Sequence, residues 1–267
     1  MDVVEVKTED GRTLGFGNGQ FQVIAGPCSV ESYEQVLGIA RAVKSSGATL
    51  LRGGAFKPRT SPRSFQGLGV EGLKILSKVK HEVGIPVVSE LMAIEDLPEF
   101  EDIDVIQIGA RNMQNFRLLK EVGSQTKKPI ILKRGLSATI KELVLAAEYI
   151  LDAGNPNVIL CERGIRTFET EMRNTLDLGI VPVIHRLSAL PIIVDPSHSS
   201  GKAWIVEAAA VSATAIGADG LIIEVHNDPK NAKCDGDQSQ TPEMFDSTMK
   251  KVMEAREMAM KWWRTRC

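Results

Sequence analysis

The chain has 267 residues, of which 43% are hydrophobic and 25% are charged, so it can build a sizeable core. Its 32 Lys and Arg and 34 Asp and Glu give a formal charge of 32 − 34 = −2, and both signs are spread along the chain. This balance excludes a general nucleic-acid-binding protein and a membrane-surface protein, so we expect neither partner.

The spacing of the four cysteines matches neither a zinc finger nor a redox motif. Cys28, Cys161, Cys234 and Cys267 form no CxxC pair, and a chain of this size does not need disulfides. The N-terminus has no secretory apolar core, and the uncharged stretch 208–218 is too short to span a bilayer. We therefore expect a cytoplasmic location.

Residues 1–20 predict a short β-hairpin extension. Val3–Val6 and Thr13–Phe16 flank the turn sequence Glu9-Asp10-Gly11. We expect this hairpin to cap one end of the remaining chain, residues 21–267.

From Phe21 onward, short apolar runs alternate with amphipathic ones. The predicted strands are Phe21–Ala25, Ala48–Leu51, Pro86–Glu90, Asp104–Gly109, Pro129–Lys133, Asn157–Cys161, Pro191–Asp195 and Gly220–Val225. Helices are predicted over Tyr33–Lys44 and Thr139–Asp152, each opened by a capping box, Ser32 with Gln35 and Thr139 with Glu142. Further helices are predicted from about Val70 and over Lys202–Ile216. A closing helix begins at Pro242 and carries Phe245, Met249, Val252 and Trp263 near one face.

Eight buried-type strands alternating with helices predict an α/β fold with a parallel sheet. Eight repeats in about 250 residues fit a closed (β/α)8 TIM barrel. An open doubly wound sheet is the alternative, but no GxGxxG follows the first strand. Because no linker or low-complexity tract follows residue 20, we expect one catalytic barrel domain over residues 21–267.

The loop between Leu51 and Val70 is rich in cations and glycines. Its four cations are Arg52, Lys57, Arg59 and Arg63, and it also holds four glycines with hydroxyls at Thr60, Ser61 and Ser64. Cationic side chains neutralise phosphate, and glycine lets backbone N–H groups approach it. The loop therefore predicts a site for phosphorylated substrates. A solvated basic loop is the alternative, although such loops rarely contain so many glycines.

Polar side chains gather at the carboxyl ends of the predicted strands, where barrels of this kind carry their chemistry. One group is cationic and requires anionic ligands: Arg52, Lys57, Arg59, Arg111, Lys133 and Arg163. A second group is Cys28, His198, Glu224 and Asp235, which follow the first, seventh and eighth strands. A closed barrel makes the first and eighth strands neighbours, so these four converge. A thiolate, an imidazole and two carboxylates suit a divalent ion such as Zn, Mn, Fe or Co. Taken alone, a cysteine such as Cys28 is more often a small buried hydrophobe than a ligand, and a lone His198 is also compatible with a structural role.

Five motifs carry a resemblance to a known family. They are Ala25–Ser32, Gly53–Pro62, Gln107–Asn115, Cys161–Phe168 and Val194–His198. They resemble the 3-deoxy-D-arabino-heptulosonate 7-phosphate (DAHP) synthases, in particular the short class I-beta type that is related to 3-deoxy-D-manno-octulosonate 8-phosphate synthase. The resemblance extends from about residue 23 to about residue 239.

The resemblance implies a (β/α)8 barrel that condenses phosphoenolpyruvate with erythrose 4-phosphate, the first step of the shikimate pathway. It implies that Cys28, His198, Glu224 and Asp235 are metal ligands. It also implies that Arg111, Lys133 and Arg163 hold phosphoenolpyruvate, that Arg52 and Lys57 lie close to both substrates, and that Arg59 and Thr60 hold the sugar phosphate. We further expect Ala110 and Asp195 to bind substrate and Lys57, Cys28, His198 and Glu90 to be catalytic, with either Lys57 or a metal-bound water, near Glu90, moving the protons. The resemblance further implies a tetramer.

Two alternatives to this activity stay open. The octulosonate branch resembles Lys-Ala-Asn-Arg-Ser-Ser where this chain has Lys57-Pro-Arg-Thr-Ser61, which favours the heptulosonate branch. A non-catalytic sugar-phosphate-binding barrel would not need a thiolate. The chain shows no added regulatory domain or chorismate mutase, so we expect little inhibition by tyrosine or phenylalanine, unless an effector binds at a subunit interface.

Cys234 stands where the family more often has Ser. It precedes the expected ligand Asp235, so it lies close to the expected metal site. Its side chain either points away, as alternate residues of an extended segment do, or approaches Cys28 within disulfide range when the metal is absent.

Overall fold

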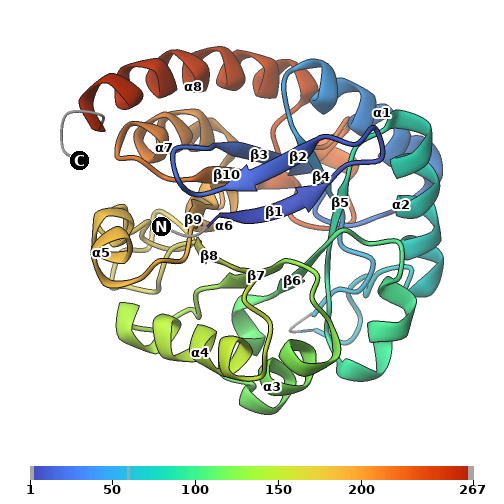
Figure 1. The fold of residues 1–267 in the computed structure, drawn as a ribbon. Helices are drawn as coiled ribbons and strands as arrows, with labels where there is room; N and C mark the ends of the chain where they lie inside the picture. Colours follow the sequence, from blue (N-terminus) through green and yellow to red (C-terminus); the bar gives the residue numbers. More distant parts are fainter. Residues whose placement is uncertain (1–2, 59–60, 264–267) are drawn as a thin grey trace.

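The structure is a computed structural model that describes residues 3–58 and 61–263. Eight parallel strands form a closed barrel in the order β10-β3-β4-β5-β6-β7-β8-β9, and helices surround it (Figure 1). A separate two-stranded sheet contains β1 and β2. The predicted (β/α)8 barrel with an N-terminal hairpin is therefore confirmed.

Each of the eight predicted barrel strands is present, with ends that differ from the prediction by no more than two residues. The strands are β3 Gln22–Gly26, β4 Leu50–Arg52, β5 Val87–Glu90, β6 Val105–Ile108, β7 Ile130–Lys133, β8 Val158–Glu162, β9 Ile192–Val194 and β10 Gly220–Glu224. The barrel closes where β10 pairs with β3, and Glu224 lies opposite Gly26. This pairing brings the segments that follow β3 and β10 side by side.

The helices of the described chain are α1 Tyr33–Ser45, α2 Val70–Val83, α3 Phe116–Gln125, α4 Ile140–Asp152, α5 Ile180–Leu187, α6 Pro196–Ser200, α7 Ala203–Ala215 and α8 Pro242–Trp263, with short 3-10 helices η1 Ile94–Phe100, η2 Ala110–Asn112, η3 Pro229–Asn231 and η4 Gly236–Gln238. The alternation of strands with α-helices is broken between β5 and β6, where η1 takes the place of an α-helix. Pro98 lies inside η1 and supplies no backbone N–H, which disfavours a longer α-helical ladder there.

One of the two predicted capping boxes is complete. The Thr139 hydroxyl accepts from the Glu142 backbone, and the Glu142 carboxylate accepts from the Thr139 backbone. At α1 the prediction is only half right. Ser32 accepts from the Gln35 N–H, but the Gln35 amide oxygen accepts from the backbone N–H of Glu31. The reason is that the amide nitrogen of Gln35 is held by the Ser29 carbonyl and the His226 ring, which carries the side chain past Ser32.

The hairpin of β1 (Val4–Lys7) and β2 (Thr13–Phe16) lies across one opening of the barrel (Figure 1). Its side chains Val4, Val6 and Phe16 are buried, and they pack with inward-facing residues of the strands: Ile24, Leu50, Val88, Val105, Ile131, Ile159, Cys161, Ile193 and Ile222. This apolar cluster closes the amino-terminal end of the barrel, as expected, and leaves the carboxyl ends of the strands available for a site.

The closing helix α8 buries the face that the sequence predicts. Phe245, Met249 and Val252 are buried, whereas the side chain of Trp263 lies outside the described residues. α8 packs along α7 and also contacts α1 (Figure 1). None of the described helices combines the length and the apolar character that crossing a membrane would require.

Candidate active site

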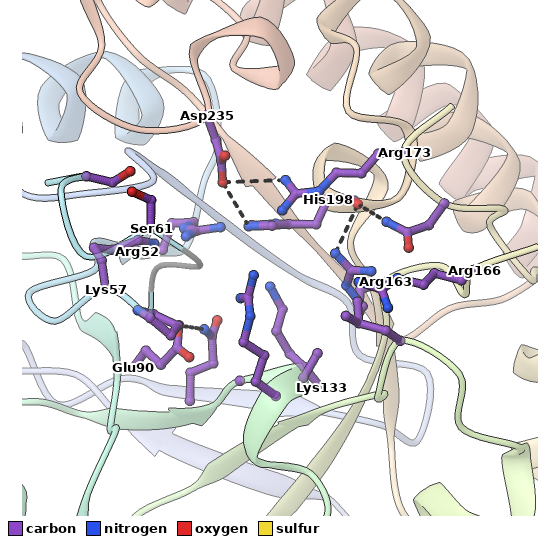
Figure 2. Close-up of a pocket in the computed structure, with 18 residues that line it drawn as sticks. Arg52, Lys57, Ser61, Glu90, Lys133, Arg163, Arg166, Arg173, His198 and Asp235 are labelled. Atoms are coloured by element: carbon purple, nitrogen blue, oxygen red, sulfur yellow. Dashed lines mark hydrogen bonds and ion pairs between the residues drawn. The ribbon is translucent and has the colours of Figure 1, made fainter. Parts of the chain in front are cut away.

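A cavity of about 340 Å³ lies at the carboxyl ends of the strands (Figure 2). Seven of the described residues that line it are cationic: Arg52, Lys57, Arg111, Lys133, Arg163, Arg166 and Arg173. Only two of the described lining residues, Glu90 and Asp235, carry a carboxylate. Seven positive side chains around one small volume repel one another, so the cavity is built for ligands with several negative charges.

Most of the predicted site residues meet at this cavity. The wall contains Arg52, Lys57, Glu90, Ala110, Arg111, Lys133, Arg163, His198 and Asp235. Cys28, Asp195 and Glu224 are fully buried and do not line the cavity. Arg59 and Thr60 lie outside the described residues.

At the deep part of the cavity, polar atoms of Arg52 and Glu224 have no hydrogen-bond partner in the described structure. Arg52 ends β4, is buried, and its Nη1 lies 3.2 Å from Glu224 Oε1 without hydrogen-bond geometry. Within the described structure, Nε and Nη1 of Arg52 and Oε1 of Glu224 have no hydrogen-bond partner. Each buried polar group left unpaired costs about 1–3 kcal/mol, so a bound anion and cation at this point would remove a sizeable penalty.

Four side chains of the kinds that ligate metal ions, here called the metal-type cluster, converge beside Arg52. The ligand atoms of Cys28, His198, Glu224 and Asp235 all lie within 4.8 Å of one another. Cys28 Sγ is 3.4 Å from Asp235 Oδ2, and His198 Nε2 is 3.2 Å from Glu224 Oε1 and 3.9 Å from Asp235 Oδ2. This set of one sulfur, one imidazole and two carboxylates, in which Glu224 Oε1 has no hydrogen-bond partner, fits a borderline divalent ion.

The protonation states of the two carboxylates and the imidazole suit metal ligation. Burial would raise the pKa of Asp235, but His198, Arg173 and Lys57 outweigh it and lower the pKa to about 2. Burial likewise opposes ionisation of Glu224, whose pKa is nevertheless lowered by His198 and Arg52. Burial lowers the pKa of His198 in spite of the nearby carboxylates. The carboxylates are thus charged and the imidazole neutral near pH 7, as ligands must be.

Asp195 connects the metal-type cluster to the cationic wall. It caps α6, where its Oδ1 accepts the backbone N–H of His198 at 2.9 Å. Its Oδ2 is 2.8 Å from His198 Nδ1 and also accepts from Lys133 Nζ. Because Nδ1 faces Asp195, Nε2 is the nitrogen directed at Glu224 and Asp235. Both Asp195 oxygens accept hydrogen bonds from these groups and the side chain is fully buried, and the substrate contact expected for it stays a prediction.

Lys57 reaches from the basic loop to Cys28. Its Nζ donates to the Cys28 carbonyl at 3.0 Å and to Cys28 Sγ at 3.1 Å. A Cβ on Gly54 would lie 2.8 Å from Lys57 Cδ and 2.7 Å from the Cys28 oxygen, so glycine makes room for this side chain. Burial alone would lower the pKa of Lys57, but Cys28, Cys234 and Glu90 raise it, so the amine stays protonated.

Glu90 is held on the opposite part of the wall from Asp235 (Figure 2). It ends β5, and its Oε2 accepts from Gln107 Nε2 at 3.1 Å. A Cβ on Gly109 would overlap the Glu90 carboxylate, so glycine at this position permits the close approach. A carboxylate and a protonated Lys57 therefore border the same cavity.

Cys234 points toward Cys28, which makes the alternative that its side chain turns away wrong. The two Sγ atoms are 3.1 Å apart. Asp235 adopts a left-handed backbone conformation, with φ +50°. This conformation breaks the alternation of an extended segment, so neighbouring residues both present their side chains to the site.

Arg166, Arg173 and Asn174 line the cavity but are absent from the sequence-based prediction. Arg173 Nη1 lies 3.6 Å from Asp235 Oδ2 and donates to Gln238 at 2.9 Å, while Asn174 donates to the His198 carbonyl at 3.1 Å. Both come from the segment 163–179 between β8 and α5 and not from a strand end. The unusual length of that segment is the signal that points to a functional loop.

The chain matches a family of known enzymes over nearly its whole length. Residues 4–261 match the model of the DAHP synthetase I family. The phospho-2-dehydro-3-deoxyheptonate aldolase of Thermotoga maritima is 52% identical over 243 residues, which cover 90% of this chain and 72% of the relative. The 2-dehydro-3-deoxyphosphooctonate aldolase of Syntrophobacter fumaroxidans is 31% identical over 263 residues, covering 91% of this chain and 89% of the relative.

Solved structures agree with this similarity. The crystal structure of the phospho-2-dehydro-3-deoxyheptonate aldolase (DAHP synthase) of Thermotoga maritima superposes with a TM-score of 0.90 and 48% identity, covering 96% of this chain and 74% of the solved one. A truncated form of 3-deoxy-D-arabino-heptulosonate 7-phosphate synthase from the same organism gives a TM-score of 0.86 and 44% identity, covering 96% of both chains.

Proposed function

Because the chain belongs to the DAHP synthetase I family, we infer that it is a 3-deoxy-7-phosphoheptulonate synthase. It is a transferase that condenses phosphoenolpyruvate with erythrose 4-phosphate to give DAHP and phosphate, the first step of the shikimate pathway. The observation that carries this inference is the strongly cationic cavity beside a four-donor cluster, in a chain 52% identical to a named relative. Release of phosphate from phosphoenolpyruvate that depends on erythrose 4-phosphate is the direct test.

The cations divide between the two substrates. We propose that Arg111, Lys133 and Arg163 bind the phosphate and carboxylate of phosphoenolpyruvate, and that Arg52 lies near both substrates. Ala110 borders the same pocket through η2. Arg59 and Thr60 are assigned to the sugar phosphate by the resemblance, and the neighbouring Ser61 lines the described cavity. Fixing two anions in this way supplies orientation, which is a large part of the rate of a two-substrate reaction.

Cys28, His198, Glu224 and Asp235 are proposed to hold the divalent ion, which would polarise the aldehyde carbonyl as a Lewis acid. The enol C3 of phosphoenolpyruvate attacks the aldehyde carbon, and the Lys57 ammonium donates a proton to the aldehyde oxygen. Water then adds at C2, Glu90 accepts the proton of that water, and phosphate leaves by C–O cleavage. The Glu90 and Lys57 assignments are supported by their places on the same cavity wall.

Finer attributes remain part of this proposal. We place the protein in the cytoplasm, as a homotetramer, with a hairpin extension over residues 1–20 and one barrel domain over residues 21–267. Zn, Mn, Fe and Co all suit the donor set. The octulosonate branch is disfavoured by the Lys57-Pro-Arg-Thr-Ser61 element, of which Lys57, Pro58 and Ser61 line the described cavity.

Asp195 is proposed as a positioning residue. Replacing it by Asn should turn an N–H toward His198 Nδ1 and release the ring, which should weaken metal binding roughly 10- to 100-fold. Competition with a chromogenic chelator measures this affinity without any assay of activity. Asp177→Asn is the matched control, because Asp177 also pairs with a buried cation, Arg134, but is not bonded to His198. Unchanged metal affinity in Asp195→Asn would show that the contact has no role in ligation.

Arg59 provides the test of the sugar-phosphate site. Arg59→Ala should raise the KM for erythrose 4-phosphate far more than the KM for phosphoenolpyruvate, because a charge-assisted contact of about 2–3 kcal/mol is lost. This corresponds to a roughly 30- to 160-fold increase. Arg63→Ala removes a cation from the same loop that does not line the cavity, so it should change neither KM appreciably. Equal increases in both KM values for Arg59→Ala would show that Arg59 is misassigned.

A further inference from the structure

Cys28 and Cys234 form a close pair of thiols, and the proposed reaction uses Cys28 as a metal ligand but gives Cys234 no role. The two residues are 206 positions apart in the chain, yet their sulfurs are 3.1 Å apart. Both side chains are buried, with 0% and 2% of their surface exposed. Cys161, the other cysteine in the described residues, is buried in the cluster beneath the hairpin, where its Sγ donates to the Glu162 carbonyl.

The fold itself maintains this proximity. Cys28 follows β3, and Cys234 lies in the segment after β10, the strand that pairs with β3 to close the barrel. The backbone N–H of Lys233 donates to Glu31 at 2.9 Å, which ties the two segments together next to the sulfurs. The left-handed conformation of Asp235 completes the arrangement. The pair is thus held by strand pairing, a hydrogen bond and a turn, and it does not depend on the flexibility of a surface loop.

We propose that Cys28 and Cys234 are a site of reversible oxidation, and that they form a disulfide when the protein lacks its metal. A disulfide requires the sulfurs to come about 1 Å closer than they are in this structure, a movement within the reach of side-chain rotation. Because Cys28 cannot be a thiolate ligand and a disulfide sulfur at once, metal binding and oxidation exclude each other. This competition rests on the proposed metal site, whereas formation of the disulfide does not.

Hydrogen peroxide serves as the oxidant in this proposal. One sulfur attacks a peroxide oxygen, the O–O bond breaks, and a sulfenic acid and hydroxide form. The second sulfur then attacks the sulfenic sulfur, so that an S–S bond forms and the S–O bond breaks. The hydroxide of each step takes up a thiol proton. Two thiols and one peroxide therefore yield one disulfide and two waters, and the sulfurs supply both electrons.

The consequence is that Cys234 protects a metal ligand. With Cys234 present, oxidation of Cys28 stops at a disulfide, which a dithiol reductant reverses. Without Cys234, the sulfenic acid of Cys28 has no neighbouring sulfur to capture it and proceeds to the sulfinic acid, which such reductants do not reverse. Serine at position 234 would thus leave the metal site open to permanent damage.

The experiment compares metal-free and metal-loaded protein after treatment with hydrogen peroxide. Unreacted thiols are alkylated under denaturing conditions, and peptides are mapped by mass spectrometry. We expect a cross-linked peptide joining Cys28 to Cys234 in the metal-free protein, a much smaller amount in the cobalt-loaded protein, and an alkylated Cys161 in both. Two alkylated thiols at Cys28 and Cys234 in the peroxide-treated, metal-free protein would overturn the proposal.

A second measurement follows metal binding after reduction. Thiolate-to-cobalt charge-transfer absorption should return in the reduced wild-type protein and fail to return in Cys234→Ser. Cys267→Ser, which removes one thiol but leaves the pair intact, should behave like the wild type. Full recovery of Cys234→Ser would contradict the protective role of Cys234. Because mass and absorption are read without turnover, an inactive protein that still forms the disulfide would count against the proposed function and not against the dithiol.

Discussion

Removal of the divalent ion is expected to lower DAHP formation at least about 100-fold, because several kcal/mol of Lewis-acid stabilisation are lost. The prediction rests on the four side chains whose ligand atoms lie within 4.8 Å of one another, including a Glu224 oxygen with no hydrogen-bond partner in the described structure. Treatment with a chelator, followed by gel filtration under reductant, should give protein with almost no turnover. Adding back Zn, Mn, Fe or Co should restore turnover, and the ranking of the four ions would identify the preferred one.

Cys28→Ser provides the genetic counterpart of this experiment. A hydroxyl is a poor ligand for a borderline ion, so this variant should bind the ion more weakly and require a higher metal concentration for turnover. Reductant must be present throughout, so that oxidation of Cys28 is not mistaken for metal loss. Full turnover in metal-free protein, verified by elemental analysis, would contradict a catalytic role for the ion.

Lys57→Met is expected to lower kcat by roughly 10²- to 10⁴-fold, the usual contribution of a positioned proton donor. The substitution preserves most of the side-chain volume and removes the ammonium that lies 3.1 Å from Cys28 Sγ. Steady-state kinetics at saturating concentrations of both substrates and metal isolates this effect. Lys74→Met is the matched control, because Lys74 lies on the exposed face of α2, outside the cavity.

Lys57→Arg separates proton transfer from charge. Arg keeps the positive charge, but it does not give up a proton in a protein. If Lys57 is the proton donor, Lys57→Arg should remain strongly impaired. A kcat close to the wild-type value in Lys57→Arg would show that position 57 contributes only charge, and the proton donor would have to be sought elsewhere.

The barrel could be predicted because its strands repeat one simple pattern. Short β-branched runs that end in polar residues mark the strands, and the closed barrel then dictates which ends are neighbours. That rule alone brought Cys28 and Glu224 together from opposite ends of the chain, as β3 and β10 do in the structure. From the sequence no helix is predicted over η1, a 3-10 helix that contains Pro98.

The features of the site that the sequence did not predict depend on backbone and side-chain conformations, which residue spacing does not specify. Arg173 reaches Asp235 from the long segment 163–179, whose path depends on tertiary contacts. Asp195 lies three residues before His198, but the spacing does not reveal that its oxygens accept the His198 backbone N–H and face the His198 ring. The orientation of Cys234 depends on one left-handed residue, which an extended reading of the segment does not anticipate.

The most direct test of the central claim is phosphate release from phosphoenolpyruvate by the metal-loaded protein, with erythrose 4-phosphate and arabinose 5-phosphate compared as the second substrate. We expect a kcat/KM for erythrose 4-phosphate roughly 30- to 160-fold higher, since a mismatched sugar would forfeit charge-assisted contacts of about 2–3 kcal/mol. A mass spectrum of the product should show the seven-carbon DAHP. Preference for arabinose 5-phosphate would place the chain in the octulosonate branch, and no phosphate release with either sugar would contradict the proposed function altogether.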